Sequence, residues 1–146
     1  MRNHKSIKKI TKTLSANDVG ANGAHQAGIH VPKKEDILSF FPQLNNDEKN
    51  PRVRMVFRDN EDKQWDFYFI YYNNKYFGGT RNEFRLTCIS TYMKQNDLRQ
   101  GDEIIFSIDD YGDRMISFQH AGKKQVAEKR GIYLSKDWKI IHIKEK

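Results

Sequence analysis

Residues 64–72 constrain the fold most, because they read QWDFYFIYY and are dense in aromatic and β-branched side chains. Such a run favours a β-strand that packs at least one face against a core. Val53, Met55 and Phe57 alternate with Arg52, Arg54 and Arg58, and residues 59–63 supply a turn between the two runs. The sequence therefore predicts a β-hairpin at the centre of the fold.

Shorter strand patterns flank this hairpin. We expect further strands at 5–14, 28–32, 103–108, 114–120 and 138–143, with short helices near 37–41 and 89–95. Strands that outnumber helices, without regular alternation, argue against a doubly wound parallel sheet. The predicted fold class is mainly β with two short helices, in a closed or half-open barrel of mainly antiparallel strands. A length of 146 residues suits a single domain, 1–146.

Basic residues gather at both ends of the chain, which has a net charge of +7. The N-terminal segment 1–12 is basic and holds no acid, and the segment 123–146, which includes the last predicted strand, is also basic. The residues between them are slightly acidic. Basic ends suit contacts with nucleic-acid phosphates, although charge alone leaves a solvated surface equally open.

The single cysteine, Cys88, excludes an intramolecular disulfide and cannot build a structural zinc site alone. No apolar run approaches membrane-spanning length, and residues 1–12 lack the apolar middle of a signal peptide. We therefore expect a soluble cytoplasmic protein with no membrane partner.

Three stretches, in their order and spacing, resemble the N-terminal effector-binding domain of EcoRII-type restriction endonucleases. They read LSANDVGANGAHQAG at 14–28, YYN followed by FGGTRNEFRLT within 71–87, and LSKDW at 134–138. A fourth stretch, YMKQNDLRQGDEIIF at 92–106, is similar to plant DNA-binding pseudobarrels, the domains of auxin-response and related transcription factors. The resemblance runs from about residue 13 to 140.

The resemblance implies a seven-stranded DNA-binding pseudobarrel with two arms that grip the major groove. The N-terminal arm would span about 15–31 and the C-terminal arm about 78–87. In EcoRII-type enzymes this domain binds a second copy of a CC(A/T)GG-type site and releases a separate nuclease domain from inhibition. For this chain it implies recognition of double-stranded DNA as a monomer in a bacterial cytoplasm, with a nuclease domain in the same full-length protein.

Arg81, Glu83 and Arg85 stand at alternate positions, so an extended arm places all three on one face, with Asn82 and Phe84 opposite. Arginine donates two hydrogen bonds to guanine O6 and N7, and glutamate accepts one from cytosine N4. A solvated ladder of ion pairs would use the same residues. Together with the resemblance, this pattern predicts base contacts from His25, His30, Arg81, Asn82, Glu83 and Arg85.

The arms depart from the EcoRII enzyme itself at three positions. The enzyme has Tyr where this chain has His30, and Lys where it has Gly79 and Phe84, so the C-terminal arm loses two cations. Phosphate contacts position an arm without reading sequence. We expect such backbone contacts from Lys9, Lys12, Ser15, Asn17, Lys33, Lys34, Gly79 and Thr80.

Two acidic turns, 47–49 and 61–63, match the minimal pattern of acids and a lysine that a metal-dependent nuclease needs. Both are rich in charged residues and lack a buried strand context. We therefore expect a non-catalytic chain with no metal ligands and no cofactor, Mg²⁺ serving only an attached nuclease domain. Two alternatives remain, a complete small magnesium-dependent nuclease that uses the hairpin at 61–66, and a stand-alone transcriptional regulator of the same fold.

Overall fold

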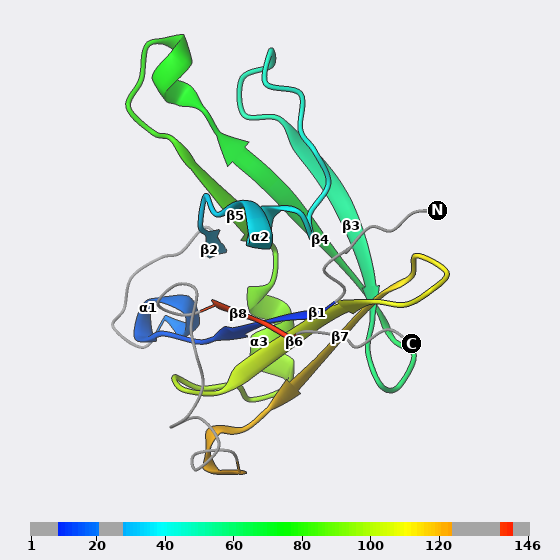
Figure 1. The fold of residues 1–146 in the computed structure, drawn as a ribbon. Helices are drawn as coiled ribbons and strands as arrows, with labels where there is room; N and C mark the ends of the chain where they lie inside the picture. The colour runs from blue at the N-terminus through cyan, green and yellow to red at the C-terminus, as the bar shows by residue number, and fades with distance from the viewer. Residues whose placement is uncertain (1–8, 21–27, 124–137, 142–146) are drawn as a thin grey trace.

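The computed structural model describes residues 9–20, 28–123 and 138–141 (Figure 1). Within these ranges the framework consists of eight strands: β1 (Lys9–Thr13), β2 (Ile29–Val31), β3 (Arg52–Arg58), β4 (Gln64–Tyr72), β5 (Glu83–Thr87), β6 (Glu103–Ile108), β7 (Arg114–Gln119) and β8 (Trp138–Ile140). The helical elements of the same ranges are short: α1 (Ala16–Val19), α2 (Glu35–Leu38), α3 (Ser90–Gln95) and the 3-10 turns η1 (Asn74–Phe77) and η2 (Ala121–Lys123). None of these helices is long and apolar enough to cross a membrane.

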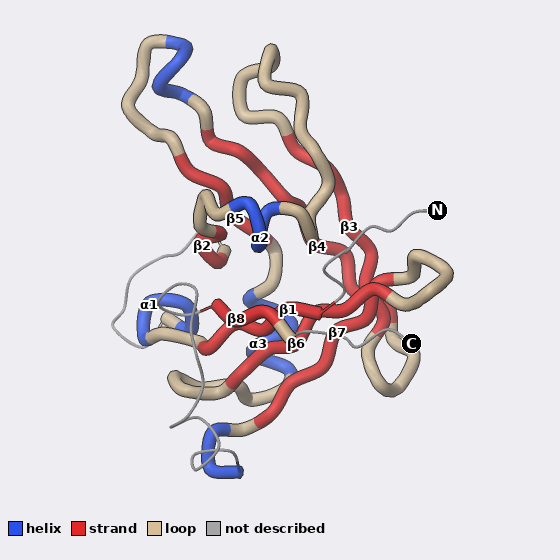
Figure 2. Tube along the Cα trace, viewed as in Figure 1, coloured by secondary structure: helices blue, strands red, loops and turns tan. Residues whose placement is uncertain are grey.

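The eight described strands form one sheet in the order β2-β5-β4-β3-β7-β6-β1-β8. Neighbours pair antiparallel, except at the centre, where β3 and β7 run parallel over two pairs, Phe57 with Arg114 and Arg58 with Met115. Figures 1 and 2 show the consequence: the half made of β2, β5, β4 and β3 crosses over the half made of β7, β6, β1 and β8. The two halves enclose the core between them.

One side chain links the two edges of this sheet, β2 and β8. The indole Nε1 of Trp138 in β8 donates a hydrogen bond to the backbone oxygen of His30 in β2, at 3.2 Å. The same indole is 2% exposed, stacks 6.1 Å from Phe106 and meets Phe41 edge-on at 6.3 Å. The curled sheet is therefore fastened by an aromatic side chain where no strand pairing closes it.

The central hairpin follows the sequence pattern. β3 and β4 pair from Arg52 opposite Ile70 to Arg58 opposite Gln64, which confirms the predicted hairpin. The odd-numbered residues of β4 from 65 to 71 are buried, as strand alternation requires. Phe41, just after α2, stacks 4.6 Å from Phe69 of this buried row. The row of aromatic rings therefore forms the main contact between the hairpin and the helices.

The predicted mainly β pseudobarrel is confirmed, with two corrections to its count of elements. The described residues hold an eighth strand, β5, which the sequence predicted only as an arm, because β5 pairs with both β2 and β4. They also hold a third α-helix, α1, within the segment that the resemblance assigned to the N-terminal arm. Ser15 Oγ accepts from the Asp18 backbone N–H (3.1 Å), and Asp18 Oδ2 accepts from the Ser15 N–H (2.9 Å). This capping box makes a single helical turn stable in a Gly-rich segment.

Candidate nucleic-acid interface

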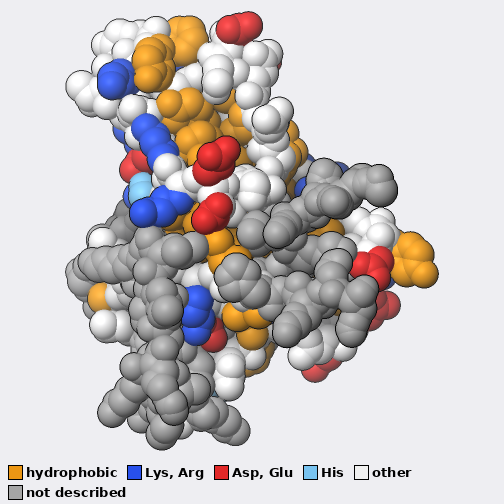
Figure 3. All heavy atoms as spheres, viewed as in Figure 1, with side chains coloured by type: hydrophobic (Ala, Val, Ile, Leu, Met, Phe, Trp, Pro, Cys, Tyr) orange, Lys and Arg blue, Asp and Glu red, His pale blue; other side chains and the backbone are white. Residues whose placement is uncertain are grey.

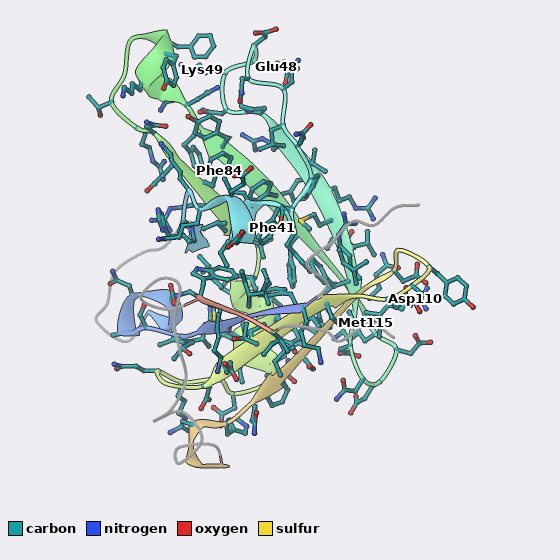
Figure 4. All side chains as sticks on the ribbon, viewed as in Figure 1. Phe41, Glu48, Lys49, Phe84, Asp110 and Met115 are labelled. Atoms are coloured by element: carbon teal, nitrogen blue, oxygen red, sulfur yellow. The ribbon has the colours of Figure 1, made fainter. Side chains whose placement is uncertain are left out.

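The outward face of the upper half-sheet carries most of the predicted base-reading residues. β5 lies between β2 and β4, and its alternation turns Phe84 and Leu86 toward the core, with Glu83 and Arg85 on the other face. Figure 4 shows Phe84 on the side of the sheet on which Phe41 lies. The polar side chains of β5 therefore gather on the face opposite the core.

Arg81, Glu83 and Arg85 form one hydrogen-bonded unit. Glu83 Oε2 accepts from Arg81 Nε at 3.1 Å and Nη2 at 2.8 Å, and from Arg85 Nε at 3.1 Å. Burial raises the pKa of the Glu83 carboxyl, but the bonds from the two arginines outweigh it and leave the pKa below its ordinary value. Glu83 is therefore ionised and holds both guanidinium groups in place.

The two arginines differ in how much of the guanidinium remains accessible. The Arg81 side chain is 42% exposed and lies flat against Tyr72, with Cζ 3.9 Å from the ring centroid. The Arg85 side chain is 17% exposed, and its Nη1 donates to the backbone oxygen of Gly28 at 3.1 Å. Arg81 is thus the better placed of the two to donate to a base, whereas Arg85 ties β5 to the residue that precedes β2.

Gly28 lets the two predicted arms come together. Its φ is +87°, a conformation that favours glycine, and a Cβ added there would overlap the backbone oxygen of Leu86 in β5. The end of the N-terminal arm therefore lies directly on the recognition strand. A sequence pattern gives no sign of this contact, because 57 residues separate Gly28 from Arg85.

His30 faces the same surface as the arginines. It is exposed in β2 and directly opposite Arg85 in the strand register. Partial desolvation, followed by the neighbouring Arg85 cation, lowers the pKa of His30 from its usual 6.5. The ring is therefore neutral at pH 7 and offers one donor and one acceptor nitrogen. His25 lies outside the described residues.

Asn82 has its amide oriented by the strand next to it. The hydroxyl of Tyr71 in β4 donates to Asn82 Oδ1 at 2.6 Å. Lys33, an exposed residue expected to touch phosphate, lies with Nζ 5.8 Å from the centroid of the same Tyr71 ring. Because its oxygen already accepts a hydrogen bond, Asn82 presents mainly its NH₂ donors. These donors suit an acceptor on a base edge. They suit adenine less well, because the adenine edge also carries a donor that requires an acceptor.

Lys12 and Ser15, both expected to contact phosphate, have structural partners. Lys12 Nζ is 2.9 Å from Asp18 Oδ2 with only 3% of its side chain exposed, because Thr11 and Lys12 are both buried where β1 pairs on each side. The Lys12 ammonium therefore neutralises the Asp18 carboxylate in this structure. Ser15 caps α1 as described above.

The remaining expected backbone contacts lie at the surface or close to it. Asn17, Lys34, Gly79 and Thr80 are exposed, and Lys9 is half-buried in β1. A Cβ at Gly79 would lie 2.9 Å from the Cβ of Asn74, so a lysine there would require the hairpin end to shift. Figure 3 shows lysine and arginine side chains along the edge where β5 and β2 lie, next to a histidine.

Three carboxylates in or beside the β3–β4 turn have partners within the hairpin. Asp59 accepts from Trp65 Nε1 (2.9 Å), which is the main reason that the Asp59 pKa lies below its ordinary value. Asp62 pairs with Arg58 and Asp66 with Arg54, at 3.0 and 2.7 Å. Within the described ranges, no group of three histidine, cysteine, aspartate or glutamate residues is placed to hold a metal ion. Asp59, Asp62 and Asp66 therefore take part in interactions within the hairpin itself.

Tyr71, Tyr72 and the Gly28 carbonyl are the residues of this site that the sequence did not single out as functional. The two tyrosines lie in the quoted motif, but only the strand register shows that Tyr71 adjoins Phe84 and Tyr72 adjoins Glu83. Tyr72 supports the Arg81 guanidinium, whereas the buried Tyr71, which stacks on Phe84, holds the amide of Asn82. Each exposed donor is therefore oriented by a tyrosine of β4.

Comparison with known proteins gives three agreeing results. The family described as "Restriction endonuclease EcoRII, N-terminal" matches residues 3–133. The type II restriction enzyme EcoRII of Escherichia coli is 40% identical over 79 residues, 52% of this chain and 19% of the enzyme. Auxin response factor 5 of Arabidopsis thaliana is 28% identical over 116 residues, 80% of this chain and 12% of that protein. The chain thus spans about a fifth or less of these curated relatives.

A solved structure confirms the fold. The Arabidopsis FUS3-DNA complex superposes with a TM-score of 0.59 at 20% identity, covering 76% of this chain and 95% of the other. Agreement over nearly all of the second chain shows that the whole curled sheet, and not one hairpin, is shared.

Proposed function

This chain belongs to the family of EcoRII restriction endonuclease N-terminal domains, and we propose that it binds double-stranded DNA sequence-specifically in the major groove. The target class is a short G·C-rich site of the CC(A/T)GG type. The observation that carries the proposal is the exposed guanidinium of Arg81, held by Glu83 and stacked on Tyr72.

The chemistry of this group matches a G·C pair. An arginine fork donates to guanine O6 and N7 together, and fixing it beforehand reduces the entropy lost on binding. All three hydrogen bonds to Glu83 end on Oε2, so Oε1 is placed to accept from the N4 amine of a cytosine. His30 and the donors of Asn82 would contact bases beside this pair.

The chain acts as a non-catalytic recognition or effector domain and binds DNA as a monomer. A nuclease domain of the same full-length protein, with its own Mg²⁺, would perform the cleavage. The likeness to auxin response factor 5 over 80% of the chain favours a second candidate, a regulator that uses the same interface without cleavage. The two differ in the attached domain and not in how this chain meets DNA.

Selection from a random pool of duplexes tests the proposal and should enrich one short G·C-rich site. Arg81→Ala should then weaken binding to that site by ~1–3 kcal/mol and relax the preference at one G·C pair. Arg81→Lys should recover only part, because an ammonium lacks the planar fork.

Arg54→Ala is the matched control, since it removes an exposed, ion-paired arginine from the neighbouring strand β3. It should leave base preference unchanged. Equal loss on selected and scrambled duplexes with Arg81→Ala would contradict base reading. Plasmid cleavage by the pure chain with Mg²⁺, abolished by Asp66→Asn, would favour the nuclease alternative.

A further inference from the structure

The end of the β4–β5 hairpin displays two aromatic side chains that the interface above does not use. Among the described residues, the large hydrophobic side chains that are exposed are Tyr76 (65%), Phe77 (44%) and Tyr111 (90%). Tyr76 and Phe77 are adjacent in η1, and Figure 3 shows hydrophobic side chains beside a basic one at this end of the molecule. Exposed aromatic side chains that cluster in this way mark a contact surface more often than those that stand alone.

The backbone under these rings is fixed. The N–H of Lys75 donates to the oxygen of Arg81 at 2.9 Å, and the N–H of Gly79 donates to the oxygen of Asn74 at 2.8 Å. Asn73, 1% exposed, accepts from the Asn50 N–H and donates to the Glu48 oxygen, so the neighbouring loop supports the turn (Figure 4). The hairpin end is therefore a rigid platform connected directly to Arg81.

The two rings have different surroundings. The pKa of Tyr71 is raised, first by burial and then by the charge and hydrogen bond of the Tyr76 hydroxyl. The Tyr76 hydroxyl therefore lies close to Tyr71 of β4. Lys75 Nζ lies 5.6 Å from the Tyr76 ring centroid. Phe77 has no stacked ring or cation recorded among the described residues and is not packed against the core. Phe77 therefore offers the free apolar surface.

We propose that Phe77 is a specificity-determining residue that contacts the C5-methyl group of a thymine in the major groove. This inference rests on the proposed function. The connection 73–82 contains Lys75 and Arg81 and no acid, so its charge suits DNA. A two-stranded ribbon fits the major groove, where an apolar side chain recognises the thymine methyl group.

The spacing limits where that thymine lies. Three residues lie between Phe77 and Arg81, so their Cα atoms are at most ~14 Å apart in an extended chain. Base pairs stack ~3.4 Å apart. The contacted thymine therefore lies within about four base pairs of the guanine that Arg81 reads.

Replacing each thymine of the selected duplex by uracil, one at a time, removes single C5-methyl groups and tests the inference. For the unmodified chain, one replacement within this window should weaken binding about fourfold, the effect of one buried methyl group. Phe77→Ala should bind the thymine and uracil duplexes equally. Phe77→Leu, which keeps an apolar side chain, should retain part of the difference.

Tyr111→Ala is the matched control, because Tyr111 is the exposed aromatic residue of the β6–β7 turn. It should keep the full fourfold difference. An unchanged ratio in Phe77→Ala, or no effect of any uracil, would overturn this inference and leave the proposed function standing. A chain that selects no preferred duplex would overturn both.

Discussion

The β6–β7 turn and the β4–β5 connection both join antiparallel strands, but they use their polar side chains in opposite ways. In the β6–β7 turn, Asp109 Oδ1 accepts the backbone N–H groups of Tyr111 and Asp113, and the Asp109 N–H bonds to the Asp113 oxygen. The β3–β4 turn repeats this pattern with Asp59. In such a turn the aspartate bonds to the turn's own backbone, so few hydrogen-bonding groups remain for a partner.

In the β4–β5 connection, by contrast, polar side chains form hydrogen bonds with other side chains. Glu83 holds Arg81 and Arg85, and Tyr71 holds Asn82. The difference separates a turn that only reverses the chain from a connection that prepares donors for a ligand. Changes in the two regions should therefore affect different measurements.

The largest expected effect is on stability and emerges from comparing two glycines with nearly equal φ values. Gly28→Ala should lower the free energy of unfolding by ~2–5 kcal/mol, the sum of the left-handed backbone cost and overpacking against Leu86. Gly112→Ala, in the β6–β7 turn, has nothing within 4 Å and should cost only ~1–2 kcal/mol. Urea unfolding measures both. Equal losses would mean that the approach of the N-terminal arm to β5 is not tight.

A second comparison removes an acid from each kind of connection. Glu83→Ala should relax base preference and weaken specific binding by ~1–3 kcal/mol, although losing a negative charge reduces repulsion by phosphate. Asp62→Ala removes a comparable arginine partner from the β3–β4 turn and should leave base preference unchanged. Competition between the selected and scrambled duplexes at one salt concentration measures both. Tighter binding of Glu83→Ala to all duplexes would show that Arg81, Glu83 and Arg85 form only a surface ion-pair ladder.

Lysines near the proposed interface and in the β3–β4 turn should differ in how they affect the salt dependence of DNA binding. Lys33→Ala and Lys34→Ala should each flatten the slope of log affinity against log salt by ~1, because each lost phosphate contact releases one counterion fewer. Lys63→Ala in the β3–β4 turn, where Nζ lies 4.4 Å from the Trp65 ring centroid, should not change the slope. A flatter slope for Lys63→Ala alone would place DNA on the opposite end of the sheet.

The smallest effect concerns pH. Since desolvation and the Arg85 cation lower the folded pKa of His30, the unfolded chain binds this proton more strongly. Stability should therefore fall as the pH drops from about 6.5 through the lower folded pKa. His30→Gln should lose less stability than the unmodified chain between pH 7 and 5 in urea unfolding. Parallel losses would show that folding does not lower the pKa of His30.

Local patterns predicted the strands and the shared face of the triplet because both depend on alternation. The buried row from Trp65 to Tyr71 and the partnership of Arg81 with Glu83 follow from period two. The capping box of α1 was visible as Ser15 and Asp18 but was overlooked within a Gly-rich segment. The other missed features are long-range, as with the bond from Arg85 to Gly28.

Lys12 illustrates the same limit. An isolated strand sequence, KITKT, suggests a solvated lysine, and only the pairing of β1 on both sides shows that the position is buried. Likewise, the sequence indicates an arm containing Arg81 but not the ring of Tyr72 beneath it. The types of chemistry in the site could be predicted, whereas the partners that orient each group could not.

The hydrogen bond from Trp138 to His30 also bears on how the chain folds during synthesis. Its two residues are 108 positions apart, and ribosomes add ~5–20 residues per second. The nascent chain therefore waits about 5–20 s after β2 emerges before the indole that covers its edge exists. For that interval Phe41 lacks its ring contact with Trp138, and chaperones that bind exposed aromatic segments have time to act.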